Sequence, residues 1–363
     1  MALASKRFGM IFTSLACLIT VGIWQVHQAT TKAQPKMDEM HSNQLAQATS
    51  MERRSMTIGN KVRTFEYFKP STGRQQKLII ALHGGLGDGI KMARMTGINQ
   101  LAQRYNYAVA YPNGVDQGRV GRWNDGRELN YRAGVVELID DKRFISDLIS
   151  KLSTEAGISL QNIYIIGGSN GGMMAQRMSC ELDLEIGGIA TVAASMPAPI
   201  SRTCKPKFFI PIMMINGTDD AIVPFHGGSV ISPRGGDVLS VKETINFWKD
   251  TFKCVIRDAN AQPYLSFADI KSRVRVNYFQ SELTQRTCVV EVTLVGGGHG
   301  WPTKTQHANI NLGSRLINNS QDGMTDRQRR RLAQIREKYQ NTRGGEAVGY
   351  DATGAIFRFI SDT

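Results

Sequence analysis

The sequence predicts an α/β protein whose doubly wound, mostly parallel sheet is flanked by helices. Two observations carry this prediction: short runs of continuous apolar residues, as buried parallel strands have, and helical patterns between several of the runs. The apolar runs lie at 77–82, 108–111, 163–166, 189–193, 212–215 and 289–295. Sheets of this class bind ligands beyond the carboxyl ends of their strands, so the residues that directly follow the runs are the candidates for chemistry.

Other local patterns agree with this class. Residues 56–58 and 62–67 flank a Gly-Asn pair, which predicts a hairpin ahead of the first buried strand. A helix is expected after the two aspartates at 140–141, because acidic side chains suit the positive amino end of a helix. One face of that helix would carry Phe144, Ile145, Leu148, Ile149 and Leu152.

Length and composition describe an ordinary globular protein. The 363 residues suit one α/β domain with tails, or two small domains. Hydrophobic residues make up 41% of the chain and charged residues 21%, a balance that argues against disordered, collagen-like and coiled-coil proteins.

A net charge of +13 would suggest nucleic acid binding if the excess basic residues were spread over the folded body. The first 36 residues hold four basic residues and no acidic one, and residues 314–346 hold eight basic and four acidic residues. Each stretch therefore contributes +4 of the 13. The body that remains is only mildly basic, so no nucleic acid partner is expected.

The amino terminus has the order of a secretory signal peptide. Lys6 and Arg7 precede an uncharged apolar run at 8–24, and small polar residues follow it. We expect a signal peptide at 1–29, cleaved near Ala29 or Ala33, and a polar linker at 30–53. The protein would then be secreted or periplasmic, with no stable membrane partner; an uncleaved anchor is the alternative.

Cleavage would remove Cys17 and leave an even number of cysteines, Cys180, Cys204, Cys254 and Cys288. In an oxidising compartment, two disulfides are expected, and four buried thiols are the alternative. Three pairings are possible; proximity along the chain favours the first cysteine with the second and the third with the fourth. No CxxC spacing is present, so no metal site is predicted.

A nucleophile motif follows the apolar run at 163–166. Residues 167–171 have the pattern Gly-x-Ser-x-Gly, with a helical pattern at 173–178 behind them. Between a strand and a helix, this pattern predicts a tight turn that exposes the hydroxyl of Ser169 at the sheet edge. The alternative is a glycine-rich turn that only packs or binds phosphate.

A serine nucleophile needs a base, which in turn needs an orienting acid. In this motif's fold class the chain order is serine, acid, histidine, so the candidates for the base are His226, His299 and His307. Glycines surround His299 after the run at 289–295, which lets that loop project the imidazole toward the serine.

The orienting acid is expected in the turn that follows the run at 212–215. This turn contains Asp219 and Asp220, and we assign Asp220 as the partner of His299, with Asp219 as the alternative. His226 lies in the same segment, too close to the acid to be the base on a separate loop. A capping role for Asp220 and a structural role for His299 are the alternatives.

An ester or amide transition state also needs hydrogen-bond donors for its oxyanion. The first candidate is the backbone N–H of Asn170, directly after the serine. The second belongs to the His-Gly-Gly loop after the run at 77–82, where Gly85 is our choice and Leu86 the alternative. His83 is expected to hold this loop by hydrogen bonds rather than to titrate in catalysis.

These motifs together resemble a known family. Leu-His-Gly-Gly at 82–85, Tyr-Pro-Asn-Gly at 111–114, Gly-Ser-Asn-Gly-Gly at 168–172, Gly-Thr-Asp-Asp at 217–220 and Gly-His-Gly-Trp-Pro at 298–302 are similar in order to secreted esterases of the polyhydroxybutyrate depolymerase and feruloyl esterase family. The resemblance implies an α/β-hydrolase fold over 54–363 and cofactor-free hydrolysis of carboxylic esters. It also favours Asp220 over Asp219, since the family pattern is Gly-Thr-x-Asp.

The sequence departs from that family at three places. Asn216 stands where His is usual, and Gly300 where Thr is usual. Residues 303–346 form a basic insertion before a predicted closing helix at 351–359, and 325–339 within it have a helical pattern. The insertion is interpreted as a solvated helix, as a lid over the site, or as a surface for anionic polymers or membranes.

Three aromatic residues, Trp123, Phe225 and Trp301, are candidates for an apolar acyl or aryl pocket, with core packing as the alternative. The sequence therefore predicts a secreted serine esterase that works through an acyl-enzyme. Its substrate would be a small or polymer-linked ester, of feruloyl or acetyl-xylan type or a short-chain polyhydroxyalkanoate. A serine peptidase and a non-catalytic surface-binding protein are the alternatives; without HExxH, a metalloenzyme is disfavoured.

Overall fold

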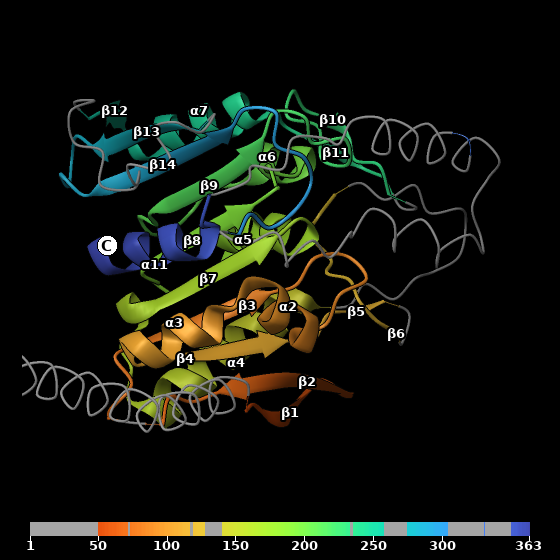
Figure 1. Cartoon of the computed structure of the whole chain (residues 1–363), viewed down its shortest axis with the longest axis vertical. Helices are drawn as coiled ribbons and strands as arrows, with labels where there is room; N and C mark the ends of the chain where they lie inside the picture. Colours follow the sequence, from red (N-terminus) through yellow and green to blue (C-terminus); the bar gives the residue numbers. More distant parts are fainter. Residues whose placement is uncertain are drawn as a thin grey trace, which may run out of the picture. The chain divides into compact units, whose positions relative to one another are not determined.

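The computed structural model describes residues 50–71, 73–116, 119–127, 140–232, 235–257, 274–303, 330 and 350–363. Ten strands pair in the order β1-β2-β4-β3-β7-β8-β9-β14-β13-β12 (Figure 1). In that order their bounds are Glu52–Ile58, Lys61–Phe68, Tyr107–Pro112, Lys77–Leu82, Ile163–Gly168, Gly188–Val192, Ile212–Gly217, Thr287–Leu294, Val274–Ser281 and Cys254–Ile256.

The centre of this sheet is parallel and its two edges are antiparallel. Strands β4, β3, β7, β8, β9 and β14 pair in parallel, and each contains one of the predicted apolar runs, apart from the last residue of the runs in β8 and β14. Hairpins close the edges, β1 with β2 at one side and β12, β13 and β14 at the other. The first hairpin turns at Gly59, whose φ of 60° suits a residue without a side chain.

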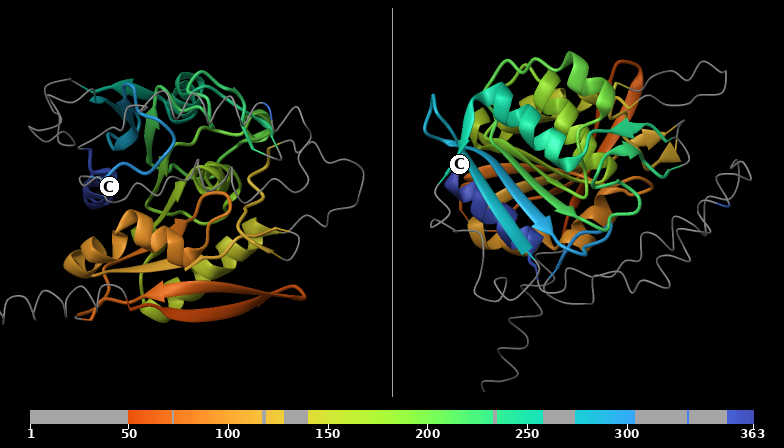
Figure 2. Two further views of the ribbon diagram at one scale, coloured as in Figure 1. Left: turned by 45° about the vertical axis from the view of Figure 1, so that its right-hand side comes forward. Right: turned by 90° about the horizontal axis from the view of Figure 1, so that it is seen from above.

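Helices cover both faces of the sheet, as Figure 2 shows from above. Helices α4 (Asp141–Ala156), α5 (Asn170–Glu181) and α7 (Val241–Phe252) pack against one face. Helices α2 (Gly89–Thr96), α3 (Ile98–Tyr105) and α11 (Ala352–Asp362) cover the other face. The expected doubly wound α/β fold, including the closing helix, is therefore confirmed.

Helix α4 shows how local sequence signals produce these elements. Its first residue is Asp141, and the side chain of Asp140 caps it by accepting the N–H of Arg143. The predicted apolar stripe is fully buried against the sheet. Gly157, with a φ of 61°, ends the helix in the left-handed conformation that glycine adopts most easily.

Residues from Met51 onward form one compact unit. Strand β1 begins at Glu52, so the last two residues of the predicted linker pair with β2. The expected signal peptide lies outside the described residues, as does the basic insertion apart from Thr303 and Arg330. Among the described helices, none has both the length and the apolar character needed to cross a bilayer.

Candidate active site

Ser169 occupies the tight turn between strand β7 and helix α5. Its φ of 52° and ψ of −121° are unusual for a residue with a side chain, and such strain is typical of functional sites. The turn is held on both sides, because the Ser169 N–H donates to the Val192 carbonyl and the Met173 N–H donates to the Ser169 carbonyl. The hydroxyl is thereby presented at the carboxyl edge of the sheet, as the motif predicts.

The glycines of the motif are required by close backbone contacts. A Cβ atom on Gly167 would lie 2.4 Å from backbone atoms of Gly171. A Cβ atom on Gly171 would lie 2.3 Å from the carbonyl oxygen of Leu82. Both distances are far inside van der Waals contact, so the turn tolerates no side chain at either position.

A chain of hydrogen bonds joins Ser169 to a histidine and an aspartate from two other loops. The Ser169 Oγ atom lies 3.0 Å from Nε2 of His299, and Nδ1 of His299 lies 2.7 Å from Oδ2 of Asp220. The side chains of His299 and Asp220 are 3% and 2% exposed, so little water competes for these bonds. The three segments meet because strands β7, β9 and β14 end at the same edge of the sheet.

The carboxylate of Asp220 is fixed by its own turn. Its Oδ1 atom accepts the backbone N–H groups of Ile222 at 2.9 Å and Val223 at 2.8 Å. Its other oxygen is directed at His299, so one carboxylate both caps the turn and contacts the imidazole. Asp219, the alternative acid, is exposed, and its side chain accepts a hydrogen bond from the adjacent Thr218.

The His-Gly-Gly loop lies directly against the serine turn. A Cβ on Gly84 would be 3.6 Å from Cβ of Ser169, and one on Gly85 would be 4.0 Å from Cβ of Asn170. The N–H of Leu86 donates to the carbonyl of Gly121. The N–H of Leu86 is therefore used in a hydrogen bond within the loop region, whereas Gly85 lies beside Asn170.

Buried His83 holds this loop in place. Its Nε2 atom accepts the N–H of Gly114 at 2.9 Å, so Nδ1 carries the proton and donates to the Gly84 carbonyl at 2.8 Å. Burial lowers the pKa of His83 from 6.5 to about 4, although the bond to Gly84 opposes the shift. The imidazole therefore stays neutral near pH 7 and keeps both bonds.

The two tryptophans proposed for a substrate pocket are buried. Trp123 is 4% exposed and donates its indole N–H to the His83 carbonyl, whereas Trp301 is 7% exposed and donates to the hydroxyl of Thr353. Little indole surface is left for a substrate, so the structure gives the predicted pocket role no support. Phe225 is half-buried and packs against the core.

Both pairs of cysteines that are neighbours in the sequence are bonded. Cys180 at the end of helix α5 is linked to Cys204, which follows helix α6 (Ala198–Thr203). Cys254 on strand β12 is linked to Cys288 on strand β14. The first disulfide ties the helix that follows the serine turn to its neighbour.

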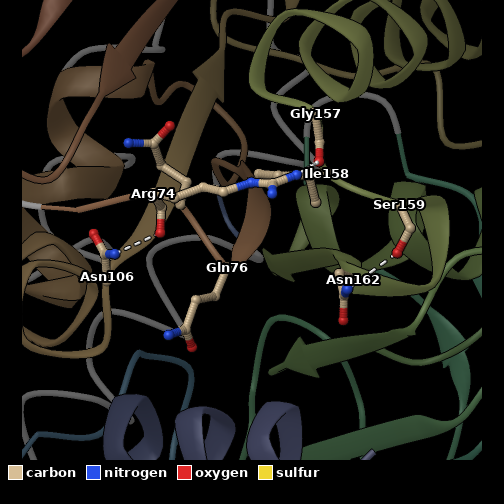
Figure 3. A pocket seen from close by; sticks show the side chains of 8 residues that line it. Arg74, Gln76, Asn106, Gly157, Ile158, Ser159 and Asn162 are labelled. Carbon is tan, nitrogen blue, oxygen red and sulfur yellow. Dashed lines mark hydrogen bonds between the residues drawn. The ribbon is translucent and has the colours of Figure 1, made fainter.

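A polar pocket of about 700 Å³ lies where the central strands begin, at the end of the sheet opposite to Ser169 (Figure 3). Its lining includes Arg74 and Gln76 before strand β3, Asn106 before strand β4, and Asn162 before strand β7. Arg74 and Gln76 precede the strand that the His-Gly-Gly loop follows, and Asn162 precedes the strand that Ser169 follows. The pocket is thus separated from the serine by the length of the strands.

Several buried polar residues near the site are not marked by any pattern in the sequence. Arg63 and Asp141 form an ion pair of 2.7 Å with side chains 2% and 1% exposed. Burial raises the pKa of Asp141, and Arg63 beside it opposes that shift. Asp125 and Arg127 form a second buried pair at 2.9 Å. The residues next to these four in the chain do not indicate that the charges are buried, so neither ion pair was predictable from local sequence.

The described residues contain no group of three or more His, Cys, Asp or Glu side chains arranged to hold a metal ion. What they contain is a serine on a strand-turn-helix elbow, bonded in series to a histidine and an aspartate on a mostly parallel sheet. This combination defines an α/β-hydrolase.

The comparisons with known proteins identify the family. Residues 66–275 match the model of the phospholipase/carboxylesterase family, and the chain belongs to that family. It is accordingly a serine hydrolase of the carboxylesterase type.

Individual relatives are distant. The chain is 29% identical over 250 residues to "Putative esterase NocK" of Nocardia uniformis subsp. tsuyamanensis, covering 65% of this chain and 68% of that protein. It is 26% identical over 182 residues to feruloyl esterase B of Piromyces equi, covering 49% of this chain but only 32% of that enzyme. An acetyl xylan esterase structure from Aspergillus awamori superposes with a TM-score of 0.45 at 13% identity, covering 69% of this chain and 94% of that one.

Proposed function

We propose that the protein hydrolyses carboxylic esters through an acyl-enzyme on Ser169, with His299 as general base and acid and Asp220 as its orienting partner. The observation that carries this proposal is the unbroken series of contacts from Asp220 to Nδ1 of His299 and from Nε2 to the serine hydroxyl, at 2.7 and 3.0 Å. Such a series is the arrangement by which a weak serine nucleophile becomes reactive.

The direction of proton transfer follows from hydrogen-bond chemistry. An ionised carboxylate can only accept, so the proton between Asp220 and His299 belongs to Nδ1, and the lone pair of Nε2 faces Ser169. As Oγ attacks the ester carbonyl, its proton passes to Nε2. The imidazolium then protonates the leaving alcohol, and a water molecule deprotonated by the same nitrogen releases the acid and restores the serine.

The oxyanion that forms during attack would be bound by the backbone N–H groups of Asn170 and Gly85. Asn170 is the first residue of helix α5, where backbone N–H groups lack partners within the helix and the helix dipole favours negative charge. Gly85 lies beside Asn170, since a Cβ atom on it would be 4.0 Å from Cβ of Asn170, and the Leu86 N–H already donates to Gly121. Both observations support Gly85 as the second donor.

The proposed substrates are small or polymer-linked esters, of the feruloyl or acetyl-xylan type or short-chain polyhydroxyalkanoates. The family match and the partial likeness to feruloyl esterase B support this class. We also propose export through the amino-terminal signal; two disulfides are in keeping with an oxidising compartment.

The test is a hydrolysis assay on purified protein with nitrophenyl esters of several lengths, methyl ferulate, acetylated xylan and polyhydroxybutyrate. Ser169→Ala should abolish hydrolysis and labelling by a fluorophosphonate probe while leaving the melting temperature near that of the wild type. Asp220→Asn should lower kcat by about 10⁴-fold because the imidazole would then favour the wrong tautomer. Undiminished hydrolysis by the Ser169→Ala variant would refute the proposal.

A further inference from the structure

The segment from Trp123 to Arg127 packs against the serine turn and binds the side chain of Asn170. The Trp123 N–H donates to Oδ1 of Asn170 at 2.8 Å, and Nδ2 of Asn170 donates back to the Trp123 carbonyl at 3.1 Å. This reciprocal pair is the pattern by which two strands bind each other. Asn170 is therefore docked on one residue of a distant segment.

Asp125 provides the other contact of this amide. Its Oδ2 atom accepts the second N–H of Asn170 at 2.6 Å, while the guanidinium of Arg127 binds the same carboxylate at 2.9 Å. The side chains of Asp125 and Arg127 are only 3% and 6% exposed. The carboxamide of Asn170 thus has both its N–H groups and its oxygen bonded, which leaves it a single orientation.

Trp123 also reaches the second loop. Its indole N–H donates to the carbonyl of His83 at 2.8 Å, and the rings of the two residues lie 4.9 Å apart. The His83 carbonyl immediately precedes Gly84 and Gly85, where an added Cβ atom would lie 3.6 Å from Cβ of Ser169 and 4.0 Å from Cβ of Asn170. One residue therefore connects the loop after strand β3 to the turn after strand β7.

We propose that Trp123 and Asp125 are positioning residues that set the distance between the backbone N–H groups of Asn170 and Gly85. This inference rests on the proposed function, in which those two groups bind the oxyanion. The donors come from separate loops, and each must lie within about 2.7 to 3.1 Å of the oxyanion. Because Trp123 is bonded to both loops, it restricts the movement of one loop relative to the other. Hydrogen bonds within a single loop cannot do this.

This role differs measurably from the two other roles open to Trp123. A packing residue contributes to stability but leaves the rate of folded enzyme unchanged. A pocket wall changes KM and the preference among acyl groups. A positioning residue changes kcat by a similar factor for every acyl group, because all of them form the same oxyanion.

Trp123→Phe removes the indole N–H and retains an aromatic ring. We expect kcat to fall about 10- to 100-fold, less than the loss of a whole oxyanion donor, with KM within about twofold. The reduction should be the same for acetyl, butyryl and octanoyl nitrophenyl esters. Inhibition by a trifluoromethyl ketone, whose adduct carries the same oxyanion, should weaken by a similar factor.

Trp248→Phe is the matched control. Trp248 is fully buried and donates its indole N–H to Gln176 at 2.7 Å, and it belongs to helix α7 rather than to either loop. This variant should lose stability and retain kcat. If Trp123→Phe does not fold, Asn170→Ala serves the same purpose, since it keeps the backbone N–H and removes the amide that Trp123 and Asp125 hold.

An unchanged kcat in Trp123→Phe, or in Asn170→Ala where that variant is used, would overturn the proposal, and so would a rate loss that varies with acyl length and appears mainly in KM. Failure of the proposed function is a different result: the wild-type protein would not hydrolyse esters, or Ser169→Ala would still hydrolyse them.

Discussion

Folding stability should depend on pH through His83, which is buried beneath the loop that carries Gly85. Its imidazole must remain neutral to accept the N–H of Gly114, and burial lowers its pKa from 6.5 to about 4. Replacement by glutamine keeps an oxygen that can accept this N–H but removes the titrating group. The comparison of the wild type with His83→Gln therefore isolates one proton.

The sign and size of the effect follow from the two pKa values. Between pH 6.5 and 4 the unfolded chain protonates at this residue while the folded protein does not, so stability falls as pH falls through this window. A difference of roughly 2.5 units at 1.36 kcal/mol per unit corresponds to about 3 kcal/mol in total. About 2 kcal/mol of this should be lost between pH 7 and pH 4.5.

Urea unfolding at a series of pH values measures the quantity directly. The free energy of unfolding of the wild type minus that of His83→Gln should decrease by about 2 kcal/mol from pH 7 to pH 4.5. Other titrating groups cancel in this difference. A difference that is constant with pH would refute the reasoning.

Three further substitutions test contacts that hold the fold and the site. Arg63→Met should cost about 3 to 5 kcal/mol in urea unfolding, because Asp141 would remain buried without its partner. Replacing Cys180 and Cys204 together by serine should lower the unfolding free energy by about 3 kcal/mol, since their disulfide spans 24 residues. Gly171→Ala should lower ester hydrolysis at least tenfold, because a methyl group there would lie 2.3 Å from a carbonyl oxygen of the neighbouring strand.

Two of these predictions have a matched control variant. Arg143 and Asp147 form an ion pair of 3.5 Å with side chains 60% and 45% exposed, so Arg143→Met should cost less than about 1 kcal/mol. A Cβ atom on Gly300 would meet no other atom within 4 Å, so Gly300→Ala should leave hydrolysis nearly unchanged. An equal loss in either control would contradict the reasoning, as would identical unfolding curves for the oxidised wild type and the double serine variant.

Much of the fold could be predicted because its signals are local. A buried parallel strand is a continuous apolar run, so each central strand was recognisable from a few consecutive residues. The first glycine of the Gly-x-Ser-x-Gly motif is required by a backbone contact inside the motif, between Gly167 and Gly171, and the motif predicts the turn that holds Ser169. The need for the last glycine, Gly171, comes from the distant carbonyl of Leu82. Strand order then brought Asp220 and His299 to the same edge, because parallel strands end there together.

The roles of Trp123 and Asp141 could not be predicted in the same way. An exposed tryptophan near the site would form a pocket wall, but Trp123 is buried and its backbone binds a side chain 47 positions away. The expected acidic start of helix α4 is confirmed, with Asp140 as its cap and Asp141 in its first turn. The pairing of Asp141 with Arg63, 78 positions away, was not predictable from the adjacent residues. Neither pairing leaves a trace in the adjacent residues.

The sequence by itself determined the fold class, the turn that exposes Ser169, and the short set of acids and histidines that could serve it. Those properties depend on apolar periodicity, glycine spacing and chain order, which can be recognised directly from the order of residues along the chain. Only the tertiary structure decided that Leu86 donates its N–H to Gly121, that the carboxylate of Asp220 also caps its own turn, and that Trp123 and Trp301 lie in the core. These choices depend on which segments pack together, because burial and hydrogen-bond partners are properties of the folded chain.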